Sequence, residues 1–473
     1  RQKDLQSVAR TFADKEFAPM MREWDEEEHF PIDVLRKSAS LGFGGLYVRN
    51  DVGGSGLGRL EASLVFEALS MGDVSTTAYM TLHNMCAWII DAFGSEQQRQ
   101  KYLPRLTSME LLSSYCLTEP GAGSDAANLS TKAVRKGSHY VLNGSKAFIS
   151  GAGASEVYLI VARTGDAGPK GISCFIVEKG FKGLSFGKKE RKVGWNSQPT
   201  RAIIMEDCEV PVENLVGAEG QGFFIAMSGL NGSRLNIGAA QASLEATLEY
   251  VKDRKRSRDL GAASQTDYKL ADLATSLLSS RLMIRQAAMA MDRNDSNASL
   301  FSSMAKLHAS ERCFAIIDEC FQVLGGYGYL EGHKLNIYLR DARVHRILGG
   351  TSEIMHPREQ PCVVSAPVTP VPATTQLLLC PVCSRAFKLG KNQNCYLRRH
   401  LKNVHNLSPT LHPRKCKWDS IPNGRVKYDK DCRERSLASK RLWARKSRLR
   451  RKAEEAAVVL CMLTDTNDAM PGL

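Results

Sequence analysis

Apolar residues recur at helical spacing through the first quarter of the chain. One stripe at positions i, i+3, i+4 and i+7 is formed by Leu5, Val8, Ala9 and Phe12. The same spacing predicts helices over residues 34–48 and 62–72, on either side of a glycine-rich loop at Gly53–Gly58. We therefore predict an N-terminal α domain over residues 1–112.

The pattern changes after residue 112 and changes back after residue 217. Short runs rich in β-branched residues predict strands at Val157–Ala162, Ile172–Val177 and Ala202–Met205. Helical spacing then returns, with one face at Leu244, Leu248 and Val251 and long amphipathic segments at Leu270–Met291 and Ser303–Leu324. Residues 113–217 are thus predicted to form a middle β domain and residues 218–356 a C-terminal α domain. This multidomain α+β order places a ligand cleft where the domains meet.

The last quarter of the chain differs in composition and charge. Pro357 cannot continue a helix, and residues 357–378, rich in proline, are predicted to be an extended linker. Residues 1–357 carry 41 Lys or Arg and 41 Asp or Glu, whereas residues 358–473 carry 23 and 9, so the whole net charge of +14 lies in the tail. Only the tail has the charge of a polyanion-binding segment.

The run Tyr115–Asp125 combines flexibility with polar chemistry. Gly121 and Gly123 allow the backbone to approach a ligand closely, and Thr118 and Ser124 supply hydroxyl donors. Taken alone, the run is compatible with a loop that holds a flat, polar-edged cofactor and also with an ordinary surface turn.

The wider context of this run resembles the acyl-CoA dehydrogenase family. The resemblance spans residues 1–356 and extends, in the family's order, through Asn143–Ser150, Trp195–Arg201, Val210–Asn214, Gly220–Phe223, Leu324–Tyr329, Arg340-Asp341 and Gly350–Met355. Three short segments are similar to the isobutyryl-CoA dehydrogenase branch of the family: Gly42–Gly45, His83–Trp88 and Lys170–Cys174. The resemblance implies the fold of that family, in which a helical domain, a β-sheet domain and a helical bundle follow one another.

The resemblance also implies FAD as cofactor and α,β-dehydrogenation of a short branched acyl-CoA, an isobutyryl-CoA-like substrate of valine catabolism. Implied FAD contacts are Tyr115, Cys116, Leu117, Thr118, Gly123, Ser124, Phe148, Ile149, Ser150, Arg254, Ser264, Gln265, Gln322, Gly325, Gly326, Thr351, Ser352 and Glu353. Arg254 matches an arginine that reaches FAD phosphates across a subunit interface. Implied acyl-CoA contacts are Ser124, Asn231, Gly232, Ser233 and Arg234.

The family's catalytic base is a glutamate at one of two places, and this chain has none at either. The place before the last Gly-Thr motif holds Gly349, and the alternative place holds Ser233. Neither residue accepts a proton at neutral pH, and loss of a general base lowers the rate by about 10²–10⁴-fold. Glu331 and Glu353 are close in sequence but occupy neither position, so no catalytic residue is identified and turnover is expected to be weak.

The tail carries a pattern typical of a two-Cys/two-His zinc finger over residues 379–406. The candidate ligands are Cys380, Cys383, His400 and His405, and Phe387 and Leu397 stand at the positions of the small core of that fold. Sixteen residues separate Cys383 from His400, against about twelve in the usual pattern. We expect a small ββα module that binds Zn²⁺.

Residues 407–473 are predicted to be a basic, partly disordered tail. The run Lys440–Lys452 suits phosphate-backbone binding or a nuclear-localisation address, and it equally suits a solvated tail without a partner. A zinc-dependent nucleic-acid-binding protein therefore stays open as an alternative function. A third interpretation is a chimera, because the family's final helix is replaced after Met355.

Compartment and assembly follow only from the resemblance. It implies the mitochondrial matrix, an electron-transferring flavoprotein as partner, and a homotetramer if the C-terminal domain is intact. The chain begins at Arg1 and not at Met, so we expect a fragment that would lack any transit peptide. No apolar run is long enough for a membrane span, and six scattered cysteines before residue 321 are expected to be packed, reduced thiols.

Overall fold

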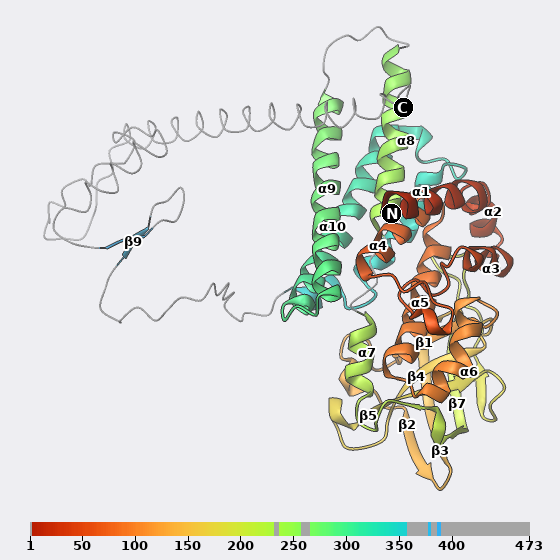
Figure 1. The fold of residues 1–473 in the computed structure, drawn as a ribbon. Helices are drawn as coiled ribbons and strands as arrows, with labels where there is room; N and C mark the ends of the chain where they lie inside the picture. Colours follow the sequence, from red (N-terminus) through yellow and green to blue (C-terminus); the bar gives the residue numbers. More distant parts are fainter. Residues whose placement is uncertain (1, 231–235, 257–264, 357–376, 380–385, 389–473) are drawn as a thin grey trace, which may run out of the picture. The chain divides into compact units, whose positions relative to one another are not determined.

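The computed structural model describes residues 2–230, 236–256, 265–356, 377–379 and 386–388. The chain divides into two units, with the break after Pro357. The first unit contains the helical domain, the sheet and the helical bundle in that order (Figure 1). This order confirms the predicted fold of residues 2–356.

The N-terminal domain is built from helices joined by loops. Its elements are α1 (Gln2–Phe12), a π-helical turn (Ala13–Phe17), α2 (Met21–Glu26), α3 (Ile32–Ser40), α4 (Arg59–Leu69), α5 (Val74–Phe93) and α6 (Glu96–Thr107). Side chains cap two helix starts: the Asp73 carboxylate accepts from Thr76 N–H at 2.7 Å, and Ser95 with Gln98 forms a capping box. Helix α5 is buried along most of its length and is the central helix of the domain.

The predicted helix over residues 34–48 is wrong beyond Ser40. Helix α3 ends there, and the chain turns at Gly42, whose φ is +82°. A side chain at Gly42 would be strained at that φ and would meet Ser55 Oγ at 2.5 Å. The apolar residues beyond it, Phe43, Leu46 and Val48, lie in a loop and are buried in the core. Their apolar spacing therefore reflects burial and not a helix.

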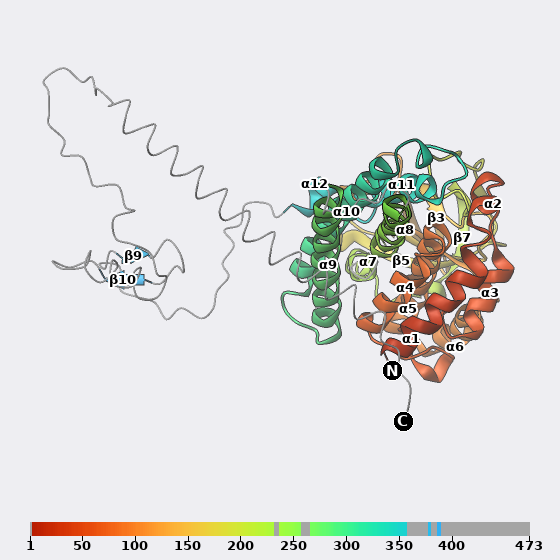
Figure 2. The ribbon, with the colours of Figure 1, turned by 90° about the horizontal axis from the view of Figure 1, so that it is seen from above.

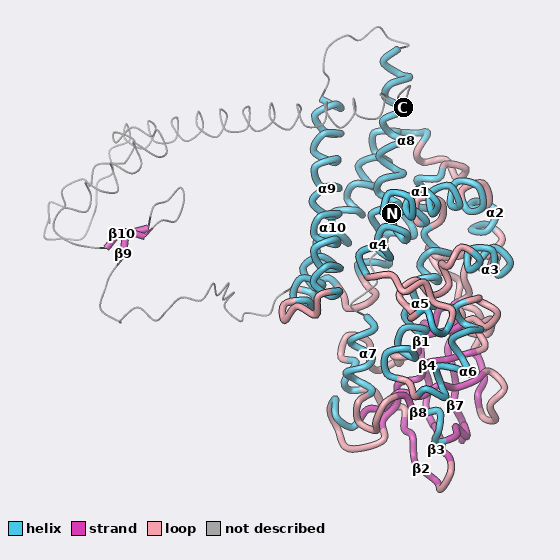
Figure 3. The backbone as a smooth tube through the Cα atoms, viewed as in Figure 1, coloured by secondary structure: helices cyan, strands magenta, loops and turns pink. Residues whose placement is uncertain are grey.

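The middle domain is one eight-stranded sheet. Its strands are β1 (Ser113–Cys116), β2 (Lys132–Lys136), β3 (His139–Ser150), β4 (Val157–Arg163), β5 (Ile172–Glu178), β6 (Leu184–Phe186), β7 (Thr200–Pro211) and β8 (Leu215–Val216). The order is β6-β7-β3-β2-β4-β5-β8, and β1 pairs in parallel with β4. All three predicted strands are confirmed. In Figure 3 the strands gather in the lower part of the first unit, with α6 and α7 at the same level.

The C-terminal domain is a bundle of long helices. It comprises α7 (Gly222–Leu230), α8 (Asn236–Arg256), α9 (Gln265–Asp292), α10 (Ala298–Leu324), α11 (Lys334–Arg343) and α12 (Ser352–Met355). Helix α10 packs against both α8 and α9, and the three lie side by side when viewed from above (Figure 2). One apolar core joins them to α11, which confirms the predicted amphipathic helices.

Two buried polar clusters join the domains of the first unit. Glu67 of α4 pairs with Arg281 and Arg285 of α9. Asp341 of α11 accepts from Trp195 N–H at 2.7 Å, in a turn of the sheet domain where Trp195 has φ of +56°. The domains are therefore tied by specific charged and hydrogen-bonded groups as well as by apolar packing.

Asp341→Asn is expected to raise stability above neutral pH. Burial raises the pKa of Asp341 well above its ordinary value, and the nearby Asp73 carboxyl adds to that shift. A raised folded-state pKa means that this group's contribution is complete below the unfolded pKa of about 4 and is lost as pH rises toward the folded pKa. Asparagine keeps an acceptor for Trp195 and removes the charge, so we expect a gain in the free energy of unfolding that is larger at pH 8 than at pH 5, measured by urea unfolding. An equal effect at both pH values would contradict the assignment.

The second unit is described only in two short strands. β9 (Leu377–Leu379) and β10 (Ala386–Lys388) pair antiparallel, with Phe387 opposite Leu378. The predicted zinc ligands Cys380, Cys383, His400 and His405 lie outside the described residues, as does the basic run at 440–452. In the part of the chain that is described, no cluster of three or more His, Cys, Asp or Glu side chains could hold a metal ion.

Two further expectations concern the described chain. Cys86, Cys116, Cys174, Cys208, Cys313 and Cys320 are free and buried, as predicted for packed thiols. Among helices in the described ranges, none combines the length and apolar character that crossing a membrane requires.

Candidate functional site

The predicted flavin loop leaves the carboxyl end of β1 and makes a tight turn. Glu119 and Ala122 exchange two backbone hydrogen bonds of 3.1 Å across Pro120-Gly121. Gly121 and Gly123 are exposed, and a Cβ built on either would have no neighbour within 4 Å. The outer face of the turn is therefore an open backbone surface, where a flat ligand can approach closely.

A second segment lies directly beside this loop. Ala147 N–H of β3 donates to Thr118 O at 2.8 Å, which places Phe148 next to the loop. Phe148 has φ of +58° and is 72% exposed, a rare conformation and environment for an aromatic side chain. The structure thus brings together two groups that were predicted from separate motifs, residues 115–124 and 148–150.

Not every predicted residue of this region presents a side chain. Cys116, Leu117 and Ile149 are buried in the core, so only their backbone groups are available to a ligand. Tyr115 donates its hydroxyl to Ala226 O of α7 at 3.3 Å, and burial raises the pKa of Tyr115 well above its usual range. Half-buried Thr118 and exposed Ser124 keep their hydroxyl groups near the surface.

The underside of the loop is fixed by a buried ion pair. Lys146 Nζ of β3 donates to Glu119 Oε1 at 2.7 Å and to Leu117 O at 3.2 Å. Burial alone would raise the pKa of Glu119, but the Lys146 ammonium and hydrogen bonds from Ser130 and Thr131 bring it down to about 2. Sequence reasoning did not identify Lys146 as a site residue. The available signal was a lysine inside an apolar strand run, Lys146-Ala-Phe-Ile149.

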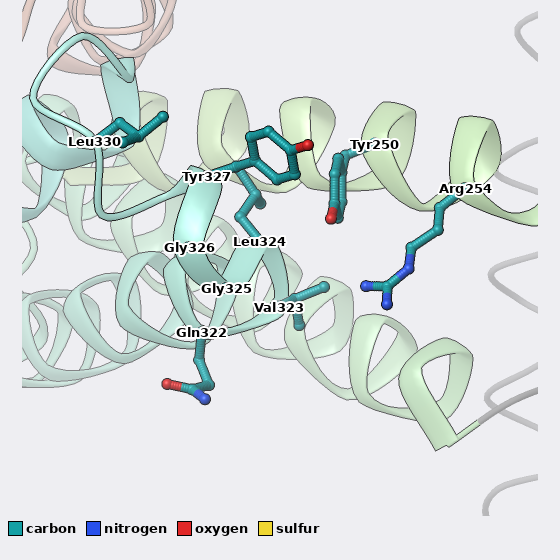
Figure 4. Close-up of a pocket in the computed structure, with 9 residues that line it drawn as sticks. All are labelled: Tyr250, Arg254, Gln322, Val323, Leu324, Gly325, Gly326, Tyr327 and Leu330. Atoms are coloured by element: carbon teal, nitrogen blue, oxygen red, sulfur yellow. The ribbon is translucent and has the colours of Figure 1, made fainter.

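A third group of predicted residues lines a pocket in the helical bundle. The pocket is a depression open to solvent, with a volume of about 540 Å³, and is lined by Tyr250, Arg254, Leu330 and the segment Gln322–Tyr327. In Figure 4 the Tyr250 and Tyr327 rings lie near each other, with centroids 6.0 Å apart, and Arg254 extends from the next turn of α8. Gly325 and Gly326 leave open space where a Cβ would stand.

The residues of this pocket differ in direction. Arg254 is exposed, so its guanidinium is free to meet an anion from solvent or from another molecule. The Gln322 side chain points away from Arg254 (Figure 4).

Two further predicted FAD contacts do not belong to the described lining of this pocket. Gln265 is exposed at the start of α9, and Ser264 lies outside the described residues.

A fourth group surrounds the place where the family carries its base. Thr351 caps α12, and the loop before it is anchored to α10: Lys306 Nζ donates to Gly350 O, and Ser352 Oγ donates to Glu311 Oε1 at 2.6 Å. Gly349 has φ of +60° and open space around a built Cβ. The loop is thus rigidly held but presents no proton acceptor at its tip.

Two glutamates lie near this loop in the sequence. Glu331 and Glu353 are both exposed. A backbone hydrogen bond and the Thr351 hydroxyl lower the pKa of Glu353, which makes its carboxylate a weaker base than an ordinary glutamate. The predicted acyl-CoA contacts Asn231, Gly232, Ser233 and Arg234 lie outside the described residues, directly after α7.

Comparison with known proteins agrees with this arrangement. Three family models match in order: the acyl-CoA dehydrogenase N-terminal domain at residues 1–110, the middle domain at 114–208 and the C-terminal domain at 220–358. Mitochondrial isobutyryl-CoA dehydrogenases from Bos taurus and Dictyostelium discoideum are both 58% identical to the chain, over 75% of its length and 86% and 87% of theirs.

A solved structure shows the same fold. Butyryl-CoA dehydrogenase from Megasphaera elsdenii is 32% identical, with a TM-score of 0.70 over 75% of this chain and 95% of its own. The matched region coincides with the three described domains and with all four groups of site residues. Residues 1–358 therefore assign the chain to the acyl-CoA dehydrogenase family, oxidoreductases that act on acyl-CoA thioesters.

Proposed function

We propose that the chain is an FAD-binding acyl-CoA dehydrogenase scaffold that takes a short branched acyl-CoA and turns it over slowly. The observation that carries the proposal is the open glycine turn of Gly121 and Gly123 with Phe148 held beside it. A flat ring with polar edges fits such a surface, because backbone amides and the Thr118 and Ser124 hydroxyls supply donors along one edge. The identity with isobutyryl-CoA dehydrogenases supports the branched acyl chain.

The proposed roles follow from the chemistry of each group. FAD, when bound, would accept the hydride that leaves the β carbon of the acyl thioester. Thr118 and Ser124 orient the ring, Phe148 shields it from water, and Arg254 offers a planar guanidinium to a diphosphate. Asn231 to Arg234 are proposed to hold the acyl-CoA. Gly349 has no side chain to remove the α proton, so the chain's own residues bind and orient the substrate while the proton transfer is slow.

Further features of the proposal rest on the family resemblance. The electron acceptor is proposed to be an electron-transferring flavoprotein, and the compartment the mitochondrial matrix, as for the mitochondrial relatives. The family resemblance puts the arginine that matches Arg254 at a subunit interface, and the exposure of Arg254 leaves it available for that role. A homotetramer is the proposed assembly.

The test uses the full chain reconstituted with FAD. We expect a yellow protein whose flavin absorption shifts when isobutyryl-CoA binds, while bleaching under anaerobic conditions stays slow. A colourless protein after reconstitution would overturn the proposal. Rapid bleaching would show that another group removes the α proton.

Replacing Arg254 by glutamine is expected to weaken FAD binding by about tenfold or more, because a charge-assisted pair to phosphate is lost. Titration of apoprotein with FAD, followed by flavin fluorescence, measures the change. Arg293→Gln is the matched control, since Arg293 is also an exposed arginine of the bundle but lies outside the pocket. Equal affinity of the two variants would remove Arg254 from the site.

A second candidate function concerns the tail. Strands β9 and β10 bracket the sequence that contains Cys380 and Cys383, which favours a zinc-stabilised hairpin. Together with the charge excess of residues 358–473, this supports zinc-dependent binding of nucleic acid. Salt-sensitive retention on DNA that disappears with a chelator would support it, and retention that is unchanged by the chelator would exclude the zinc-dependent form.

A further inference from the structure

The Lys146–Glu119 pair is among the most deeply buried charge pairs of the described chain. The side chains are 0% and 2% exposed, and their charged atoms are 2.7 Å apart. A lysine without a partner at such a place would be destabilising, and strand residues in apolar cores are seldom charged. The pair therefore needs a structural or functional reason beyond packing.

The contacts of Glu119 identify what the pair holds. One carboxylate oxygen accepts from Ser130 N–H at 2.6 Å and from Ser130 Oγ at 2.7 Å, and the other accepts from Thr131 N–H at 3.0 Å and from Lys146. Glu119 lies near the start of the segment that joins β1 to β2 and contains the flavin loop, and Ser130 and Thr131 lie at the end of that segment. The carboxylate thus closes the base of the loop and fixes its width.

Lys146 fixes the same loop from the sheet. Its ammonium donates to Leu117 O, one residue before Thr118, and the next residue of β3 donates its N–H to Thr118 O. Burial lowers the pKa of Lys146, and the Glu119 carboxylate opposes that shift. Two successive carbonyls, those of Leu117 and Thr118, are therefore held by two successive residues of one strand.

The open side of the loop has no comparable support. Gly121 and Gly123 are exposed, with no atom near a built Cβ, and Ser124 is exposed. The position of Thr118 relative to Phe148 is thus set from beneath the loop, by groups that themselves have no surface for a ligand.

We propose that Lys146 and Glu119 are positioning residues for the flavin, which hold Thr118 and its peptide group in register with the isoalloxazine ring. This inference rests on the proposed function of the loop. Neither side chain touches the ring. Each acts through Leu117, Thr118 and the loop closure at Ser130 and Thr131.

The test compares Lys146→Met and Glu119→Gln with the parent chain. We expect FAD affinity to fall about 10–100-fold in each variant, because each loses a charge-assisted hydrogen bond. We also expect the visible absorption bands of the flavin to lose their fine structure as the ring becomes mobile. Hydrogen–deuterium exchange of the apoprotein should speed up in residues 117–131 while exchange in α8 to α10 stays at the parent rate. Glu119→Gln retains hydrogen-bond acceptance and remains informative if Lys146→Met fails to fold.

Glu67→Gln is the matched control. Glu67 is also buried and paired with cations, but it joins α4 to α9 and has no contact with the loop. We expect its melting temperature to fall while its FAD affinity stays within about twofold of the parent. If all three variants have the same FAD affinity and the same exchange in residues 117–131, the pair is merely structural and the inference is overturned.

The exchange measurement separates this inference from the proposed function. A parent chain that binds no FAD would overturn the flavin assignment, and the positioning role with it. Faster exchange confined to residues 117–131 would then still show that the pair fixes the loop, for a ligand of another kind.

Discussion

Gly349→Glu is expected to raise the rate of acyl-CoA dehydrogenation by about 10²–10⁴-fold, the usual contribution of a positioned general base. The substitution places a carboxylate immediately before Gly350-Thr351, where the family resemblance puts its base. The anchors of that loop, Lys306 on Gly350 O and Glu311 on Ser352, come from α10 and are unaffected by the change. A new side chain at 349 therefore projects from a loop that is already fixed.

The local geometry tolerates this substitution. A Cβ at Gly349 has no atom within 4 Å, so no clash arises. Its φ of +60° lies in the left-handed region, which costs a residue with a side chain about 1–2 kcal/mol. The neighbouring Gly350 is different, because a Cβ there would meet Met355 Cε at 2.2 Å. A glutamate at position 349 therefore costs only backbone strain, whereas a side chain at position 350 would also clash with Met355.

The measurement is anaerobic bleaching of bound flavin by isobutyryl-CoA in single-turnover mode. Gly349→Gln is the control, because it has the same size and the same backbone strain but no basic group. If the flavin of both the glutamate and the glutamine variant bleaches at the parent rate, a carboxylate at position 349 does not remove the α proton. If both variants are equally faster, the effect is one of loop conformation.

Glu67→Ala is expected to lower the free energy of unfolding by about 3–5 kcal/mol, the typical result of removing one partner from a buried ion pair. The Glu67 side chain is 4% exposed, and its two oxygens pair with Arg281 and Arg285. Burial lowers the pKa of Arg285, and the Glu67 charge opposes that shift. Without the carboxylate, two guanidinium groups one turn apart on α9 are left at the junction with α4 without their shared counter-charge.

Urea unfolding at neutral pH measures this loss. Glu26→Ala is the control, since Glu26 pairs with Arg22 at the surface and an exposed i,i+4 pair contributes only about 0.3–0.5 kcal/mol. We expect the melting transition of Glu67→Ala to broaden or split as well, because the contact joins two domains. A loss below about 1 kcal/mol would show that Arg281 and Arg285 find other acceptors, for which Gln241 and Ser63 are in place.

The spacing of apolar residues correctly predicted most helices and strands, and it failed where a glycine ends a helix. Helices α8 to α10 and strands β4, β5 and β7 follow directly from the spacing of apolar residues, because each has one face or both faces in a core. The helix predicted over residues 34–48 failed beyond Ser40, since apolar spacing does not register a left-handed glycine at position 42.

The sequence by itself determined the family of residues 1–356, the glycine turn at 121–123 and the absence of a carboxylate at position 349, because these depend on residue identity and order along the chain. Only the tertiary structure decided which charges meet. The pairing of Lys146 with Glu119, of Glu67 with Arg281 and Arg285, and of Asp341 with Trp195 joins residues 27 to 218 positions apart. Such contacts depend on how strands and helices are brought together in space, and no local periodicity contains that information.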